Sequence, residues 1–452
     1  MIPFRPLPWG VAALACALTA CTTLSDDAGT ASVTSAARER LGQELRLART
    51  DEDAAAIAQR VNELLAAPLS AGSATQIALL NNRGLQASLH DLGIAEAEMV
   101  QASRLPNPHF SFARLTRGSE VEIDRTFSFN LGALLALPFA REIEAHRFSA
   151  AQQSVTMEML GLAAQTRQAW VSAVAAEQSL RYAEQVKRAA NASAELAARM
   201  ARAGNFSKLQ QMREQGFQAD AALGLARAQQ ARVAARERLT RLLGLSGAQT
   251  QFTLPDRLPD LPDRLVEAPD AAQVAAAQRL DVQAARAQVE ATARNLGLTR
   301  TTRFVSVLEF GWQHNTSNEQ PRQTGYEISF EIPLFDWSGA RVARAEAVYQ
   351  QSAQRAAQAA INAQSELREA YEGYRSAWEI ARQYRDEIVP TAKRISDENL
   401  LRYNGMLIGV FELLADARAQ IVSVNAAIEA QRDFWVAQAA LDMALVGPLT
   451  TH

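Results

Sequence analysis

The sequence predicts a mainly α-helical fold with a small β part patterned for a membrane, and it predicts that this fold is built twice. The chain has 452 residues, and one order of elements (helix, two short strands, very long helix, tight turn, further helix) is expected at 74–244 and again at 270–447. A period near 200 residues is too long for a solenoid of small repeats and indicates a duplicated domain. Alternating apolar and polar residues in the strands, and long helices of about 65 residues, are the other two observations.

Short segments of the two copies match each other. Segment 202–205 returns as 402–405, and segment 242–244 returns as 445–447. Arg83 returns as Arg279. Low identity within a shared pattern is what an old duplication leaves.

The first 20 residues have the plan of a secretory signal peptide. Arg5 precedes an apolar stretch at 10–18, and small residues end it. The segment Leu18-Thr19-Ala20-Cys21 resembles a bacterial lipobox. The resemblance implies that Cys21 becomes the first mature residue and carries a lipid with acyl chains such as palmitate, and that Thr22 favours sorting to the outer membrane. The alternative is an ordinary cleaved signal in which Cys21 is incidental.

Composition and motifs exclude several classes of function. The formal net charge is -3 and no long basic block is present, so nucleic acid is not an expected partner. After the signal no run of eighteen apolar residues occurs, so a membrane crossing would have to be made by strands. The sequence has no phosphate-binding GxxxxGK[ST] loop, HExxH or GxSxG, and its five histidines are scattered. We therefore expect no enzyme activity, no cofactor and no metal site.

Four strands are expected, at about 108–117, 124–132, 304–315 and 324–334. The last alternates most cleanly, with Tyr326, Ile328 and Phe330 on one side and Glu327 and Glu331 on the other. Each run is about ten residues long, which a tilted strand needs to cross the hydrocarbon of a bilayer. One face would meet lipid, and the other would meet water.

A soluble four-stranded sheet with one buried face is the alternative. Against it, no other part of the sequence offers a cover for the sheet, and exposed aromatic rows aggregate in water. Four strands cannot close a barrel, and an open edge in lipid leaves backbone groups unpaired, so the chain would share a barrel with its own copies. Eight strands would be filled by side chains, whereas twelve leave an aqueous lumen lined by Glu309, Glu327, Glu331 and Asn130.

Long helices are expected at 139–203 and 339–403, flanked by helices at 74–104, 207–243 and 270–302. Apolar residues, half of them alanine, recur at three- and four-residue steps in the first long helix, which indicates a packing seam. The alternative is a free antiparallel coiled-coil bundle. The remaining segments are a proline-rich linker at 245–269 that cannot be one helix, an extension at 21–73 with a helix at 51–67, and a short tail at 448–452.

Three segments carry a family likeness. The strand exit 332–341 (IPLFDWSGAR), the turn 403–405 (YNG) and the segment 413–417 (LLADA) resemble the TolC-type outer membrane efflux proteins. The resemblance covers nearly all of the chain beyond about Ala71. It implies a homotrimer with a twelve-stranded β-barrel in the lipid of the cell outer membrane and a twelve-helix α-barrel through the periplasm. It also implies docking to a periplasmic adaptor protein and, through it, to an inner-membrane transporter.

The resemblance also implies a function for the two tips, the turns that join one helix to the next. They would close the tube at rest and receive the adaptor, with docking residues Gly204, Asn205, Phe206, Ser207, Met406, Leu407 and Ile408. The gate residues would be Arg402, Tyr403, Gly405, Glu412 and Asp416. Each tip glycine can adopt the left-handed conformation that ends a helix. Glu412 and Asp416 share a helix face and would form carboxylate rings, or they are simply a solvated face.

Three functions follow from these expectations. The leading one is the passive exit duct of a tripartite efflux pump. The others are the outer-membrane pore of a type I protein secretion system and a lipid-anchored coiled-coil scaffold without a pore. The transported substrate is left open, because a duct takes whatever its pump delivers.

Overall fold

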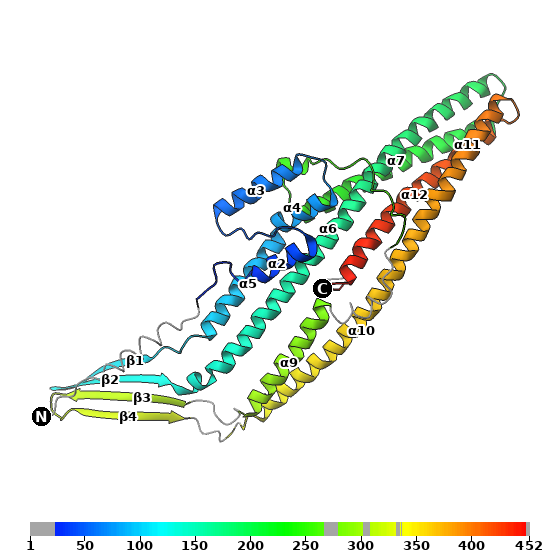
Figure 1. Ribbon diagram of the computed structural model, residues 1–452. Helices are drawn as coiled ribbons and strands as arrows, with labels where there is room; N and C mark the ends of the chain where they lie inside the picture. The colour runs from blue at the N-terminus through cyan, green and yellow to red at the C-terminus, as the bar shows by residue number, and fades with distance from the viewer. Residues whose placement is uncertain (1–22, 266–278, 302–307, 331–334, 336, 449–452) are drawn as a thin grey trace. The chain divides into compact units, whose positions relative to one another are not determined.

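The computed structural model describes residues 23–265, 279–301, 308–330, 335 and 337–448. It is mostly helical, with one four-stranded sheet (Figure 1). The chain divides into two compact units. Unit 1 comprises Met1–Val33, Ser88–Val155 and Val282–Ala359, and unit 2 comprises Thr34–Ala87, Thr156–Asp281 and Ala360–His452. Each unit is described by itself.

Unit 1 holds the sheet. Its strands are β1 (His109–Arg117), β2 (Glu120–Asn130), β3 (Leu308–Ser317) and β4 (Gln323–Phe330), paired antiparallel in chain order. All four predicted strands are found. The predicted bounds of the second strand, 124–132, are wrong, because β2 begins at Glu120 and stops before Leu131. Residues 304–307 and 331–334, which the sequence also assigns to strands, lie outside the described residues.

The first long helix, α6 (Leu131–Arg202), begins eight residues before the predicted start at 139. The side chain of Asn130 explains the start, since its Oδ1 accepts a hydrogen bond from the backbone N–H of Ala133 at 2.7 Å and so caps the helix. Pro138 therefore lies inside the helix, where a proline removes one backbone bond. The sequence pattern places a boundary at Pro138 that the fold does not use.

Two further pairs of helices follow the predicted order. They are α5 (Arg83–Ala102) with α9 (Leu280–Thr301), and α7 (Lys208–Leu243) with α12 (Val410–Ala444). The second long helix is not continuous as predicted: it consists of α10 (Gly339–Gln383), a π-helical turn η3 (Tyr384–Ile388) and α11 (Val389–Asn404). Pro390 lies in the first turn of α11, and the π turn accommodates its missing N–H.

The predicted helix at 74–104 is also divided, into α4 (Ala71–Asn81) and α5, with Asn82 in an extended conformation between them. The reason is a tertiary contact. Asn81 Nδ2 donates to the carbonyls of Leu243 and Gly244, at 3.0 and 2.8 Å, and so satisfies the end of α7. Gly244 has φ +66°, and a Cβ there would lie 2.5 Å from the carbonyl oxygen of Asn81, so only glycine fits.

The corresponding place in the second half has a related contact. Arg279, whose side chain is fully buried, donates to the carbonyl of Ala444 near the end of α12 and pairs with Asp281 and Glu366. The backbone N–H of Leu280 donates to the carbonyl of Val446 at 2.9 Å. In both halves, residues that precede a helix satisfy the end of the second hairpin helix.

The N-terminal extension in unit 2 contains α2 (Ala31–Ala36, which begins in unit 1), the π turn η1 (Ala37–Leu41) and α3 (Asp51–Leu65). The predicted helix at 51–67 is confirmed. Two glutamine side chains hold the extended segment before it: Gln76 exchanges two hydrogen bonds with the backbone of Glu44, and Gln86 bonds to the backbone of Arg46 and Ala48.

The linker between the halves is held by side chains that donate to its carbonyls. Trp435 Nε1 donates to Pro259 O at 3.0 Å, and Trp378 Nε1 donates to Pro262 O at 3.0 Å. Its described part contains one short 3-10 turn, η2 (Gly247–Thr250), and otherwise no helix, as its prolines predict. Within the described ranges, none of the helices combines the length and the apolar character that a membrane span requires.

Candidate membrane sheet and helical tip

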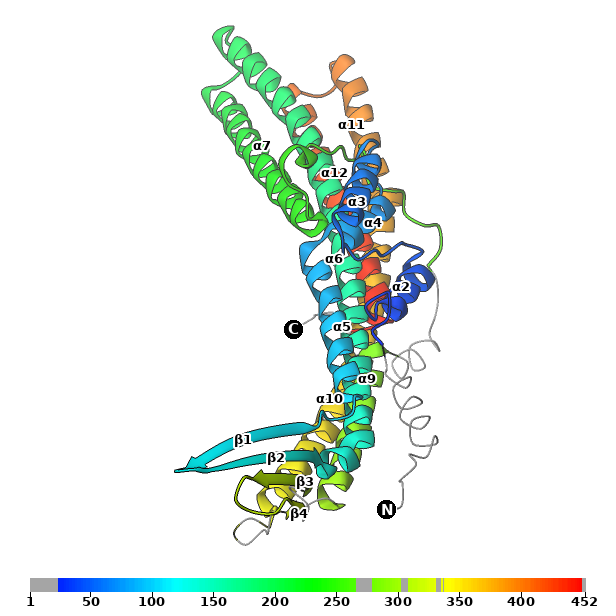
Figure 2. The ribbon, with the colours of Figure 1, turned by 90° about the vertical axis from the view of Figure 1, so that its left-hand side faces the viewer.

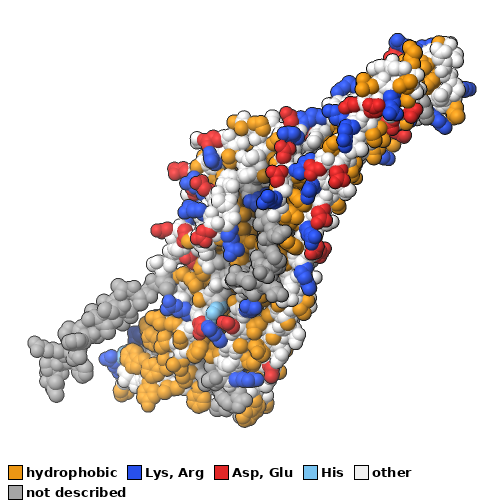
Figure 3. Space-filling model, turned by 45° about the vertical axis from the view of Figure 1, so that its right-hand side comes forward, with side chains coloured by type: hydrophobic (Ala, Val, Ile, Leu, Met, Phe, Trp, Pro, Cys, Tyr) orange, Lys and Arg blue, Asp and Glu red, His pale blue; other side chains and the backbone are white. Residues whose placement is uncertain are grey.

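The strand register sorts the side chains of the sheet into two faces. Phe110 is opposite Phe127, which is opposite Trp312, which is opposite Tyr326, so all four rings lie in one row on one face. Phe129, Phe310 and Ile328 form the next row. Apart from the half-buried Phe310, these side chains are exposed in the single chain, Tyr326 at 76 %, and hydrophobic side chains gather over the strands in Figure 3.

The other face is polar. Glu309 lies opposite Asn130 on one side and Ser329 on the other. The carboxylate of Glu327 accepts hydrogen bonds from Gln313 Nε2 at 2.7 Å and from Ser329 Oγ at 3.3 Å. The predicted alternation is confirmed for these residues, whereas Glu331 lies outside the described part of the chain.

The sheet has two open edges. Among the described strands, β1 pairs only with β2 and β4 pairs only with β3. Each edge strand therefore presents a row of backbone N–H and C=O groups to which this sheet supplies no partner.

Unit 2 ends in two helical hairpins, α6–α7 and α11–α12, which contact each other at their tips (Figures 1 and 2). Phe206 of the first tip is 8 % exposed and packs with Val410, Tyr403 and Leu414 of the second. It is a core residue of the tip, and docking of an adaptor by this side chain stays a prediction.

Both tips present exposed residues: Gly204, Asn205 and Ser207 are exposed in the first, and Met406 and Leu407 in the second, where Ile408 is half-buried. Met406 is 93 % and Leu407 is 78 % exposed. Ser207 caps α7 through a capping box with Gln210.

Gly204 has φ +78° and adopts the left-handed conformation that is open to it. Gly405, with φ −79°, and Gly409, with φ −80°, do not adopt it. In the second tip Met406 has φ +59° instead, an uncommon conformation for a residue with a side chain.

The predicted gate residues lie close to one another but pair within single hairpins. Arg402 Nε donates to Glu398 Oε1 at 3.1 Å, one turn earlier in α11. Asp416 accepts a hydrogen bond from Asn399 Nδ2 and so links α12 to α11. Glu412 is exposed in the first turn of α12, where a negative charge is favourable.

Sequence reasoning missed a buried ion pair between the hairpins. Glu214 on α7 is fully buried, and its carboxylate pairs with Arg418 on α12 and accepts a hydrogen bond from Ser193 on α6 at 2.6 Å. The Arg418 guanidinium also lies over the ring of Phe217, 4.6 Å from its centroid. Nothing in the local sequence distinguishes Glu214 from the solvated glutamates around it.

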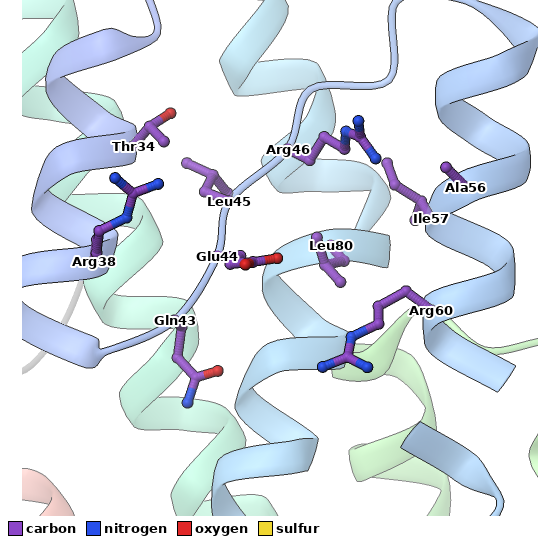
Figure 4. A pocket seen from close by; sticks show the side chains of 10 residues that line it. All are labelled: Thr34, Arg38, Gln43, Glu44, Leu45, Arg46, Ala56, Ile57, Arg60 and Leu80. Carbon is purple, nitrogen blue, oxygen red and sulfur yellow. The ribbon is translucent and has the colours of Figure 1, made fainter. Parts of the chain in front are cut away.

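A separate pocket of about 340 Å³ lies in the N-terminal extension (Figure 4). Arg38 from η1 and Arg60 from α3 lie on opposite sides of Glu44 in that view. Arg60 also pairs with Glu63 at 3.1 Å. Because acids neutralise part of its charge, the pocket is not assigned as an anion site. Across the described ranges, no group of three or more His, Cys, Asp or Glu side chains is placed to hold a metal ion.

Comparison with known proteins relates the chain to outer-membrane channels by fold. No family model matches the sequence, and no curated protein matches it. Solved structures do match.

The outer membrane protein VceC of Vibrio cholerae has a TM-score of 0.67 at 14 % identity, and the match covers 88 % of this chain and 97 % of that one. The CmeC outer membrane channel of Campylobacter jejuni has a TM-score of 0.69 at 14 % identity, covering 89 % of each chain. The open MtrE outer membrane channel of Neisseria gonorrhoeae has a TM-score of 0.67 at 19 % identity, covering 86 % and 89 %. The chain therefore has the fold of these outer membrane proteins.

Proposed function

We propose that this chain is one third of a TolC-type outer-membrane channel, the passive exit duct of a tripartite efflux system. The observation that carries the proposal is the four-stranded sheet, which has two open edges and one exposed aromatic face. In water, a row of Phe, Trp and Tyr is an aggregation hazard. In a bilayer it is favourable, provided that every backbone group is paired.

Closure by copies of the chain solves the edge problem. If β4 of one copy pairs with β1 of the next, each open edge finds a partner, and the sheet becomes a barrel of four strands per copy. Two copies give eight strands, whose interior is filled by side chains. Glu309 and Glu327 would then be buried as charges, at a large cost in free energy. Three copies give a barrel wide enough for water, and these carboxylates line it.

The helices offer a surface for the same assembly. A groove of about 720 Å³ between α6, α7 and α12 has several small residues in its lining, among them Ala176, Ala183, Ala228 and Ala231. Small side chains let a neighbouring helix approach closely. We propose that helices of adjacent copies pack here and continue the barrel as a helical tube in the periplasm.

The partners and the anchor complete the proposal. The exposed Met406 and Leu407 would contact a periplasmic adaptor, and the adaptor would connect the duct to an inner-membrane transporter that supplies the energy. The acids Glu412 and Asp416 would face the aperture at the tip. Cys21 would carry the lipid that tethers the N-terminus to the outer membrane.

Disulfide cross-linking between copies tests the proposal. Ser329 on β4 is replaced by cysteine, a second cysteine is walked along β1 from His109 to Arg117, and Cys21 is replaced by serine in every variant. At the correct register, oxidation should yield covalent dimers and trimers, and the single-cysteine variants serve as controls. If denaturing gel electrophoresis shows only the monomer for every cysteine position on β1, the proposed assembly is overturned.

Two measurements separate the alternatives. A coiled-coil scaffold gives no single-channel conductance in a planar bilayer, whereas a duct does. Deleting the gene and measuring both sensitivity to toxic compounds and the amount of secreted protein distinguishes an efflux duct from a type I secretion pore.

A further inference from the structure

The described acidic residues of the sheet all lie on one of its two faces. On the face that carries the aromatic rows, the charged or titratable side chains are basic: Arg114, Arg125 and His314. None of the described strand residues on that face is acidic. The acids lie on the opposite face, which also carries His109 and Arg117: Glu120, Glu122, Asp124, Glu309 and Glu327. A strand end that is merely solvated has no reason to exclude acids from one face.

The basic residues also lie at one height. The row after Phe110–Phe127–Trp312–Tyr326, toward the hairpin turns, is Phe112–Arg125–His314–Thr324, and Arg114 follows one row later. Rows on one face are about 6.7 Å apart along a strand, hence about 5 Å apart along the normal of a bilayer at a tilt near 40°. Toward the helices, three successive rows are apolar or aromatic. The order along the strands is therefore apolar, then aromatic, then basic.

This order matches the cross-section of half a bilayer. Aromatic side chains of membrane strands lie at the level of the headgroups, and an arginine on the lipid face is costly at the midplane but not near the interface. Guanidinium groups bind phosphate through two parallel hydrogen bonds. Arg114 is exposed, and Arg125, which donates to Thr316 Oγ1 at 3.5 Å, is partly exposed.

We propose that Arg114 and Arg125 form a binding surface for the phosphate groups of anionic lipid headgroups in the leaflet at the turn end of the strands. The proposal rests on the proposed function, because it requires the aromatic face to meet lipid. It adds that the protein selects anionic lipids for its boundary on this side of the membrane.

Fluorescence quenching by brominated lipids tests it, because Trp312 lies on the same face, one row from Arg125. The protein with Trp337 replaced by phenylalanine is reconstituted in phosphatidylcholine that contains increasing fractions of either brominated phosphatidylcholine or brominated phosphatidic acid. A Trp312→Phe variant corrects for the remaining tryptophans. The ratio of the two apparent binding constants measures the preference for the anionic headgroup.

The expected preference for phosphatidic acid is at least about threefold, and it should shrink as salt screens the charges. It should fall to about one in Arg114→Gln/Arg125→Gln, and it should persist in Arg114→Lys/Arg125→Lys. Arg117→Gln is the matched control, since Arg117 lies at the same end of the sheet but on the acidic face, and it should leave the preference unchanged.

The two possible failures are distinguishable. If brominated phosphatidylcholine does not quench Trp312, the aromatic face does not meet lipid, and both the proposed function and this inference fail. If it quenches but the anionic lipid is not preferred, or the glutamine variant keeps the preference, only the headgroup surface is overturned.

Discussion

Arg418 on α12 forms an ion pair with Glu214 on α7, a carboxylate with no exposed side-chain surface. The two residues are 204 positions apart and connect the hairpin of the first half to that of the second. Breaking a buried pair by removing one partner is strongly destabilising, because an uncompensated charge is left behind.

The pair should respond asymmetrically to mutation. Arg418→Ala leaves the buried carboxylate of Glu214 with only the hydroxyl of Ser193, and we expect a loss of about 3 kcal/mol in local stability. Glu214→Gln should cost less, because Arg418 is partly exposed and can reach water. Hydrogen exchange of α7 amides around residue 214 measures both. Arg402→Ala, which breaks an exposed pair within one helix, is the control and should cost less than about 0.5 kcal/mol.

The same substitution should loosen the contact between the hairpins. If the tips close the duct, Arg418→Ala should raise the open probability of single channels in a planar bilayer. Arg375→Ala, which breaks an exposed pair with Glu379 within α10, should not. Equal open probability in both variants would mean that the Glu214–Arg418 pair stabilises the fold without holding the tip shut.

Met406 combines high exposure with an uncommon backbone conformation. Met406→Gly removes the side chain and relieves the positive φ, so the tip should be as stable as before or more stable by about 1 kcal/mol. Phe206→Ala should instead lose about 3 kcal/mol, because it empties the shared core of the two tips. Thermal unfolding in detergent compares the two.

Met406→Gly then becomes a test of docking. A photo-cross-linking amino acid at position 407 should capture a periplasmic partner in cells, and capture should fall in the Met406→Gly background. Unchanged capture would place the adaptor contact elsewhere on the tip.

The cap of α3 should be sensitive to acid. The hydroxyl of Thr50, with the backbone N–H groups of Arg49 and Thr50, holds the pKa of Asp53 below its usual value. A lowered pKa in the folded state gives a stabilisation that is complete above the unfolded value of about 3.9 and is lost as the pH falls through the lower folded value.

Amides at the start of α3 should therefore lose protection below about pH 4 after correction for intrinsic exchange. In Asp53→Asn this pH dependence should disappear. Asp51→Asn, outside the capping box, serves as the control. Protection that is independent of pH in the unmodified protein would contradict the role of Asp53.

Cys21→Ser should abolish acylation. Mass spectrometry of the mature N-terminus should find a diacylglyceryl thioether in the unmodified protein and none in the variant. The variant should still insert into the outer membrane, because the strands and not the lipid are proposed to span it. A mature protein without lipid would favour the ordinary cleaved signal.

The faces of the strands could be predicted from the sequence because side chains alternate with a period of two, whatever the partner strand. The helix at 51–67 could be predicted for a similar reason, since its cap is local. The break at Asn82 could not, because it depends on carbonyls at 242–244. The helix start at Leu131 was hidden by Pro138, a residue that usually marks a boundary.

At the tip, too, some features follow from the local sequence and others depend on contacts in the folded chain. Glycine can take the left-handed conformation in both turns, but in the second turn Met406 takes it instead. The Glu214–Arg418 pair joins segments whose contact exists only in the folded chain. Patterns along the sequence therefore predict elements and faces, whereas contacts between the halves decide where elements break and which charges are buried.

The central claim is that the sheet is closed by two further copies of the chain. The mass of the detergent-extracted protein, measured by native mass spectrometry, tests it most directly. The proposal predicts a complex of three subunits that keeps its mass on dilution. A stable single subunit, with its aromatic sheet face covered only by detergent, would contradict it.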